Sequence, residues 1–355
     1  MHGEGLNAGE MAQADPGPDP EAGLARLTEL LAPFPAAAVR RAPEKGRFLV
    51  AAADLGHGET VLRGHSYATA VLGSHVKRVC ASCMDDFERR LEICCKDCQQ
   101  VYYCSEACRE RHRTGYRRQS GRSRSCVPHR LTCPVLGPFA SGRFDTEMES
   151  VLRLLVDVYA LRYLEEHVGD LDWEPTPLAD GEGTEGTDGA AGPRGEEEER
   201  LAGALGGLAL ADRAPVTFTH ADFLDLQTHA ADLSGPQKKE FVKPLRFMAK
   251  AFARAEGAWP GFTAPPKEEM VDWASRIDSN CFGLFLDKDH KREPELAGRE
   301  VYLLASLMNH SCIPNCEIDV NRTHFELKAR EAIPAGTELT VSAAAPGRGG
   351  GGAED

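Results

Sequence analysis

Residues 80–133 carry four pairs of potential metal ligands: Cys80-Ala81-Ser82-Cys83, Cys95-Lys96-Asp97-Cys98, Tyr103-Cys104-Ser105-Glu106-Ala107-Cys108 and His129-Arg130-Leu131-Thr132-Cys133. A two-residue gap lets two thiolates from one tight turn take adjacent corners of a tetrahedron. A four-residue step places two side chains on the same face of a helical turn. Eight ligands make two closed four-coordinate sites, which is the structural type of zinc site. We therefore expect a segment that draws most of its folding free energy from two zinc ions.

The remaining cysteines fit this interpretation. Nine of the 12 cysteines fall between positions 80 and 133, and the other three are Cys281, Cys312 and Cys316. Such clustering in a chain that is expected to be intracellular favours metal ligation, because reducing compartments do not favour structural disulfides. Cys94 and Cys126 are expected to be bystanders. His112 follows Cys108 by four residues and is an alternative ligand to His129.

Composition excludes several classes of protein. The 355 residues carry a net charge of −14, so nonspecific polyanion binding by the whole surface is not expected. No apolar run reaches the roughly 18 residues of a membrane span, and residues 1–20 do not read as a secretory leader. We expect a monomeric, intracellular protein that does not bind membranes, in the nucleus, the cytoplasm or both.

A second motif lies near the C-terminal end. Met308-Asn309-His310-Ser311-Cys312-Ile313-Pro314-Asn315-Cys316 follows directly on the apolar run 301–307. A buried strand that runs into so many polar side chains needs partners for each of them, from the fold or from a ligand. A polar turn ended by Pro314 and Asn315 is the alternative without function.

The cysteine-rich segment resembles a MYND-type zinc finger, because residues 103–108 match its central signature. The resemblance implies interleaved pairs, with one zinc on Cys80, Cys83, Cys104 and Cys108. The second zinc would lie on Cys95, Cys98, His129 and Cys133. We prefer His129 to His112 because residues 129–133 reproduce the ending of the family motif. Twenty residues separate Cys108 from His129, whereas the family has about seven there.

The second motif resembles the signature of SET-domain protein methyltransferases, and residues 325–340 resemble the strand and turn that complete it. A SET domain split by a MYND finger is the layout of the SMYD family of lysine methyltransferases. The resemblance implies that S-adenosylmethionine is bound by Gly46, Arg47, Asn280, Asn309 and His310. It also implies two zinc ions and a protein substrate. No catalytic residue is assigned.

Three departures separate this sequence from the family. The family tyrosine falls at Ala343, Phe48 replaces the second glycine of a Gly-x-Gly loop, and no cysteine-rich segment follows residue 342. We expect the C-terminal end to be truncated or divergent. In the family that segment completes a third zinc site, for which Cys316 matches the remaining ligand.

We expect an α+β fold with small SET-type sheets, an inserted zinc finger and a helical region. The expected ranges are a disordered segment 1–37, a SET N-terminal part 38–79, the finger 80–133, a helical insertion 134–275 with an acidic disordered loop 174–202, a SET C-terminal core 276–342 and a disordered tail 343–355. Between Arg109 and Arg130 eight arginines face one acid, Glu110, which is a weak signal for nucleic-acid binding.

Two functions remain open. The first is a SMYD-like protein-lysine N-methyltransferase, active or, without a tyrosine at Ala343, inactive in this chain. The second is a zinc-dependent module without catalysis that binds proline-containing peptides through the finger, as the MYND resemblance implies.

Overall fold

The computed structural model describes residues 20–114, 127–142, 144–167, 218–286, 295–321 and 324–342. The predicted loop 174–202, the tail 343–355 and most of the arginine-rich stretch lie outside these ranges, as do Cys126 and Ala343. Within them the chain is a mixture of helices and small sheets, which confirms the α+β class.

Seven α-helices and two short 3-10 turns are present in the described ranges. They are α1 (Pro20–Leu31), α2 (Glu106–Thr114), α3 (His129–Leu136), η1 (Gly137–Ser141), α4 (Thr146–Glu166), α6 (His220–Leu224), α7 (Gly235–Phe252), α8 (Lys267–Asn280) and η2 (Ala305–Leu307). Side-chain caps begin three of them. The Asp145 side chain accepts from the Met148 N–H before α4, and capping boxes built on Thr219 and Ser234 precede α6 and α7.

The strands are short. They are β1 (Ala37–Ala42), β2 (Gly46–Ala51), β3 (Thr60–His65), β4 (Ala68–Val71), β5 (Ile93–Cys94), β6 (Tyr102–Tyr103), β7 (Cys281–Leu286), β8 (Glu295–Val301), β9 (Asn309–His310), β10 (Cys316–Asn321), β11 (His324–Ala329) and β12 (Thr340–Val341). They pair as β1-β2, β10-β11-β3, β4-β8-β7, β5-β6 and the parallel pair β12-β9.

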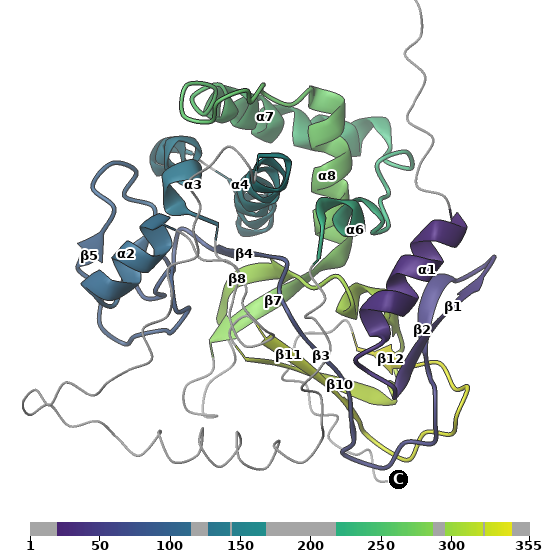
Figure 1. The fold of residues 1–355 in the computed structure, drawn as a ribbon. Coiled ribbons are helices and arrows are strands. Elements are labelled where there is room, and N and C mark those ends of the chain that lie inside the picture. Colours follow the sequence, from purple (N-terminus) through teal and green to yellow (C-terminus); the bar gives the residue numbers. More distant parts are fainter. Residues whose placement is uncertain are drawn as a thin grey trace, which may run out of the picture.

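The elements form two packed regions around the sheets. Figure 1 shows α3, α4, α7 and α8 gathered on one side of the small sheets, with α2 and β5 at one flank and α1, β1 and β2 at the other. One hydrophobic cluster joins the helices to the cysteine-rich segment. A second cluster lies between α1 and strands β2, β3 and β11, where Leu49, Leu62 and Leu327 are fully buried.

Two expected boundaries are wrong. Residues 20–31, expected to be disordered, form α1, because Leu27, Leu30 and Leu31 share one helix face and are buried in the second cluster. Residues 1–19 lie outside the described ranges. The boundary expected at 275/276 falls inside α8, whose buried Trp273 and Ile277 keep the helix continuous to Asn280.

The polar motif after η2 is held by main-chain and side-chain hydrogen bonds. Strand β9 pairs with β12, so Asn309 lies opposite Thr340 and His310 opposite Val341. The Asn315 side-chain amide donates to the Glu338 carbonyl (2.8 Å) and accepts from the Thr340 N–H (2.9 Å). Asn315 therefore ties the two segments together.

Candidate functional site

The first group of cysteines combines two distant parts of the cysteine-rich segment. Cys80 and Cys83 lie on one turn, Cys104 follows β6, and Cys108 lies on α2. Their sulfur atoms are within 4.8 Å of one another, with Cys83 Sγ 3.7 Å and Cys108 Sγ 3.5 Å from Cys104 Sγ. Zinc–sulfur bonds of about 2.3 Å make the edge of a tetrahedron about 3.8 Å. The four thiols therefore fit a tetrahedral zinc ion.

The second group contains Cys95, Cys98, His129 and Cys133, and its ligand atoms also lie within 4.8 Å of one another. Cys95 Sγ is 3.6 Å from Cys133 Sγ, and Cys98 Sγ is 3.4 Å from His129 Nε2. The other ring nitrogen of His129 is 3.1 Å from Thr132 Oγ1, which orients the imidazole. These four side chains fit a closed zinc site equally well.

His112 is not a member of either group. Its Nδ1 is 3.1 Å from the Tyr103 hydroxyl, and its ring centroid lies 5.2 Å from that of His129. Cys94, on β5, is also outside both groups among the described residues.

The pairs Cys80/Cys83 and Cys95/Cys98 lie on turns of the same conformation. Met84 and Gln99 directly follow the second cysteine of each pair, and both have a left-handed φ, 58° and 55°. The Met84 N–H donates to the Cys80 carbonyl, and the Gln99 N–H donates to the Cys95 carbonyl. Non-glycine residues rarely adopt this conformation, so the tight turn is maintained against a local cost. The sequence carried no signal for this, since neither position is glycine.

The ligand side chains of the second group are in hydrogen-bond contact with one another. A hydrogen bond with Cys133 is the main reason that the pKa of Cys98 is lowered to about 4. Burial lowers the pKa of His129, but hydrogen bonds with Cys95 and Cys98 outweigh this and raise it to about 9. Both shifts come from hydrogen bonds among the four ligand groups, and the lowered pKa of Cys98 favours the thiolate, which is the form that binds zinc.

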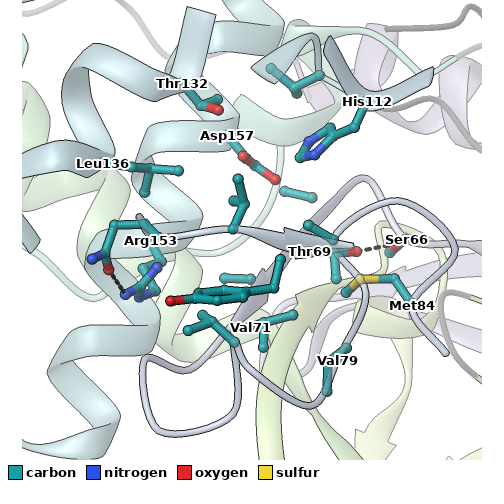
Figure 2. A pocket seen from close by; sticks show the side chains of 18 of the residues that line it. Ser66, Thr69, Val71, Val79, Met84, His112, Thr132, Leu136, Arg153 and Asp157 are labelled. Atoms are coloured by element: carbon teal, nitrogen blue, oxygen red, sulfur yellow. Dashed lines mark hydrogen bonds between the residues drawn. The ribbon is translucent and has the colours of Figure 1, made fainter. Parts of the chain in front are cut away.

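The cysteine-rich segment packs on helix α4 and strand β4. A cavity of about 90 Å³ lies at this junction. Figure 2 shows its lining, with His112 and Met84 from the segment, Thr69 and Val71 from β4, and Arg153 from α4. The Arg153 guanidinium donates to Gln100 Oε1 (2.7 Å) and to Glu149 Oε1 (2.8 Å). This buried bridge fixes the segment against α4.

A separate cleft of about 290 Å³ lies between β2, α8 and η2. It is lined by residues far apart in sequence: Arg41, Gly46, Arg47, Asp225, Leu226, Gln227, Asn280, Ser306 and Leu307. Its volume is just below the usual range for small-molecule sites, about 300–1,000 Å³. The cleft joins three of the five predicted cofactor residues, Gly46, Arg47 and Asn280. It also contains Ser306, which the sequence analysis missed because the residue lies before the recognised motif.

The polar side chains of the cleft are held in place. Asn280 Nδ2 donates to the carbonyls of Gln227 (2.8 Å) and Arg276 (2.7 Å), so Oδ1 is its remaining polar atom. Arg47 pairs with the Asp225 carboxylate and also donates to the Asp225 carbonyl. Burial lowers the pKa of Arg47, and the charges of Arg41 and Arg276 add to this effect. The charged residues of the lining are Arg41, Arg47 and Asp225, so the lining carries one net positive charge.

Asn309 and His310 lie beside the cleft rather than among its lining residues. Asn309 Nδ2 donates to Glu338 Oε1 at 2.7 Å, and His310 is exposed. Their assignment to the cofactor stays a prediction. Phe48 is also outside the lining, and its ring lies 5.5 Å from Lys45 Nζ. Cys316 is 1% exposed in the second hydrophobic cluster, whereas Cys312 is exposed.

Comparisons with known proteins agree on one family. The SET domain family model matches residues 46–342. The mouse protein "Histone-lysine N-methyltransferase SMYD3" is 24% identical over 298 residues, which cover 84% of this chain and 52% of that protein. A SET and MYND domain-containing protein of Dictyostelium discoideum is 22% identical over 320 residues, which cover 86% of this chain and 73% of that protein.

The chain spans about half the length of SMYD3. A solved structure described as "Crystal structure of the SET domain of LSMT bound to Lysine and AdoHcy" has a TM-score of 0.35 and 11% identity, and covers 93% of this chain and 55% of that chain. That likeness is too weak to support an argument. None of the helices in the described ranges combines the length and the apolar character that crossing a bilayer requires.

Proposed function

Because the chain belongs to the SET-domain family, we propose that it is a SMYD-type protein-lysine N-methyltransferase that uses S-adenosylmethionine. The observation that carries the proposal is the cleft in which Gly46, Arg47 and Asn280 meet. These residues come from β2 and α8, and only the folded chain brings them together. The relatives named as histone-lysine methyltransferases support a protein substrate.

The cleft suits a zwitterionic cofactor. Arg41 provides positive charge for a carboxylate, and Arg47 adds a second charge that Asp225 balances. Asn280 Oδ1 and the Ser306 hydroxyl oxygen provide acceptors for an ammonium group. Because Asn280 is anchored through two main-chain carbonyls, its acceptor is preorganised and loses little conformational entropy on binding. S-adenosylmethionine bound there would supply an electrophilic methyl group. The contribution of the protein is then to align a neutral lysine amine with that group and to exclude water.

We also propose that the cysteine-rich segment is a MYND finger with two structural zinc ions on the eight grouped ligands. The sulfur–sulfur distances of 3.5–3.7 Å support this. They are far longer than the about 2.05 Å of a disulfide. Both sites are closed, so the metal would hold the segment on α4 and take no part in methyl transfer.

A second function is favoured by one residue. The family tyrosine, whose hydroxyl polarises the reacting groups, is replaced by Ala343. A chain without that hydroxyl would serve as a zinc-dependent interaction module, binding proline-containing peptides through the finger.

Calorimetry with S-adenosylhomocysteine tests the first proposal. We expect saturable binding by the zinc-loaded protein and at least tenfold weaker binding after Arg47→Gln, which removes a charge from the cleft. Arg330→Gln removes an equal charge from an exposed position and should leave the affinity unchanged. No heat with the wild-type protein at millimolar ligand would overturn the enzyme proposal. Binding without turnover, with activity gained in Ala343→Tyr, would support the second function for the natural chain.

A further inference from the structure

Helix α7 carries a row of exposed basic side chains along one face. Lys239, Lys243, Arg246 and Lys250 recur at intervals of four, three and four residues, and all four are exposed. At 3.6 residues per turn these positions fall on one stripe. Arg254, just beyond the helix, continues the spacing and is also exposed. We call these five residues the α7 ridge.

The opposite face of α7 is buried, so the ridge points away from the protein. Phe241, Leu245, Met248 and Phe252 pack into the cluster that joins the helices to the cysteine-rich segment. Figure 1 shows α7 at the rim of the molecule, with α3 and α4 on its inner side. The ridge is therefore a surface feature with a rigid support.

The ridge is not neutralised by the described parts of the chain. The ion pairs within those ranges involve other basic residues, including Arg26, Arg47, Arg153 and Arg276. Within α7 the sole acid is Glu240, about 100° around the helix from Lys239. Glu240 lies three residues before Lys243, and Glu256 follows Arg254 by two residues, but neither acid forms an ion pair with the ridge within the described ranges. Five basic side chains thus face two acids, on a protein whose net charge is −14.

The arginines of α2 provide a contrast. Arg109 pairs with Glu106 and Arg113 pairs with Glu110, each at 2.6 Å. Acids on the same helix therefore neutralise these two arginines of the stretch that was the sequence-based candidate for nucleic-acid contact. None of the five basic side chains of the α7 ridge has such an ion pair among the described residues.

The chemistry of the surroundings limits the partner. From Lys239 to Lys250 the ridge is about 16 Å long, from a rise of 1.5 Å per residue. Among the described residues the only exposed large hydrophobic side chain is Ile313, which is not on α7. The ridge therefore has no aromatic side chain for stacking on bases and no apolar side chain for insertion into a membrane. Its charges fit a rigid row of phosphates.

We propose that the α7 ridge binds the phosphate backbone of double-stranded DNA without reading its sequence. Sixteen ångströms correspond to about five phosphates along one strand, at 3.4 Å of axial rise each. The wide major groove of B-DNA accepts a helix at its edge, whereas the deep and narrow groove of an RNA duplex does not. The proposal is independent of methyl transfer, because the ridge lies outside the cleft and needs no cofactor.

The test is fluorescence anisotropy with a labelled 20-base-pair DNA duplex and the zinc-loaded protein. Four phosphate contacts predict a slope of log K against log salt of about −3.6, a loss of affinity of about a hundredfold between 50 and 200 mM salt. Replacing Lys239, Lys243, Arg246 and Lys250 by glutamine should abolish most of that slope and weaken binding at least tenfold. Glutamine is a good helix former, so α7 should persist.

The matched control replaces Arg40, Arg89, Arg90 and Arg330 by glutamine. These residues are exposed and lie away from α7, and the change in net charge is the same. The control should retain the affinity and slope of the wild-type protein. If the fourfold ridge variant does not fold, Lys243→Gln and Lys250→Gln should each reduce the slope by about one. Thermal unfolding verifies the fold of every variant.

Four results would overturn the proposal. Equal losses of affinity for the duplex in the ridge variant and in the control would show that binding depends on the overall charge of the protein. Equal binding of polyglutamate would identify an acidic protein as the natural partner, and equal binding of an RNA duplex would remove the preference for DNA. A wild-type protein that binds the duplex without salt dependence would exclude phosphate contacts altogether.

Discussion

The cysteine-rich segment and the SET sheets are stabilised by different chemistry within one chain. The segment has two strands of two residues each, β5 and β6, and its centre consists of thiols and an imidazole. The sheets instead enclose fully buried leucines, of which Leu49, Leu62 and Leu327 are examples. We therefore expect the first region to depend on metal, and the second on the removal of apolar area from water. We also expect that each region can be disturbed without the other.

Loss of one ligand should have the largest effect. Cys108→Ser removes a thiol from the first group, and we expect the zinc content to fall from about two to about one per chain. Structural zinc contributes about 10–16 kcal/mol in isolated zinc-finger peptides, so the segment should unfold locally. Metal analysis and limited proteolysis measure both effects. Cys94→Ser, outside both groups, should retain two zinc ions, and a loss of metal in that variant would contradict the grouping.

A cavity in the SET sheets should have a smaller and metal-independent effect. Leu62→Ala removes a fully buried side chain from β3, and we expect a loss of about 2–5 kcal/mol in the free energy of unfolding. Chemical denaturation measures the loss, and the zinc content should stay near two. Release of zinc from folded Leu62→Ala protein would show that the two regions are not independent.

The smallest expected effect is a loss of stability of the SET sheets at acid pH. Burial raises the pKa of Glu326, but hydrogen bonds from Thr60, Lys328 and Arg63 outweigh this and lower it to about 2. A depressed pKa means that the stabilisation is present above about pH 4.5 and is lost as pH falls towards 2. For this partly exposed carboxylate we expect about 1 kcal/mol.

Glu326→Gln should remove that part of the acid dependence between pH 4.5 and 2. Urea unfolding of the variant and of the wild-type protein at several pH values makes the comparison, because any contribution from the thiols of the cysteine-rich segment is common to both proteins. An unchanged slope in the variant would show that Glu326 does not carry the effect.

The sequence predicted the family and the α+β class, and both are confirmed. Its weakest predictions concerned residues whose state depends on distant partners. Helix α1 was missed because its leucines become buried only when β2 and β11 are present. Ser306 was missed because it reaches the cleft only when η2 lies next to Asn280. Its hydroxyl donates to the Asn280 carbonyl oxygen, with 3.1 Å between the two oxygen atoms. The role of Asn315 as a tie between β9 and β12 was likewise not evident from its motif.

Within each ligand pair, spacing alone determines how far apart two side chains lie, because a two-residue or three-residue gap is closed by a single turn of backbone. Spacing does not determine which two pairs combine into one four-ligand group. Cys80 and Cys83 meet Cys104 and Cys108 across the β5-β6 hairpin, while Cys95 and Cys98 meet His129 and Cys133 on α3. Likewise, Gly46 and Asn280 share a cleft only after more than 200 residues have folded between them. Local geometry is encoded in neighbouring residues, whereas these encounters depend on the packing of the whole chain.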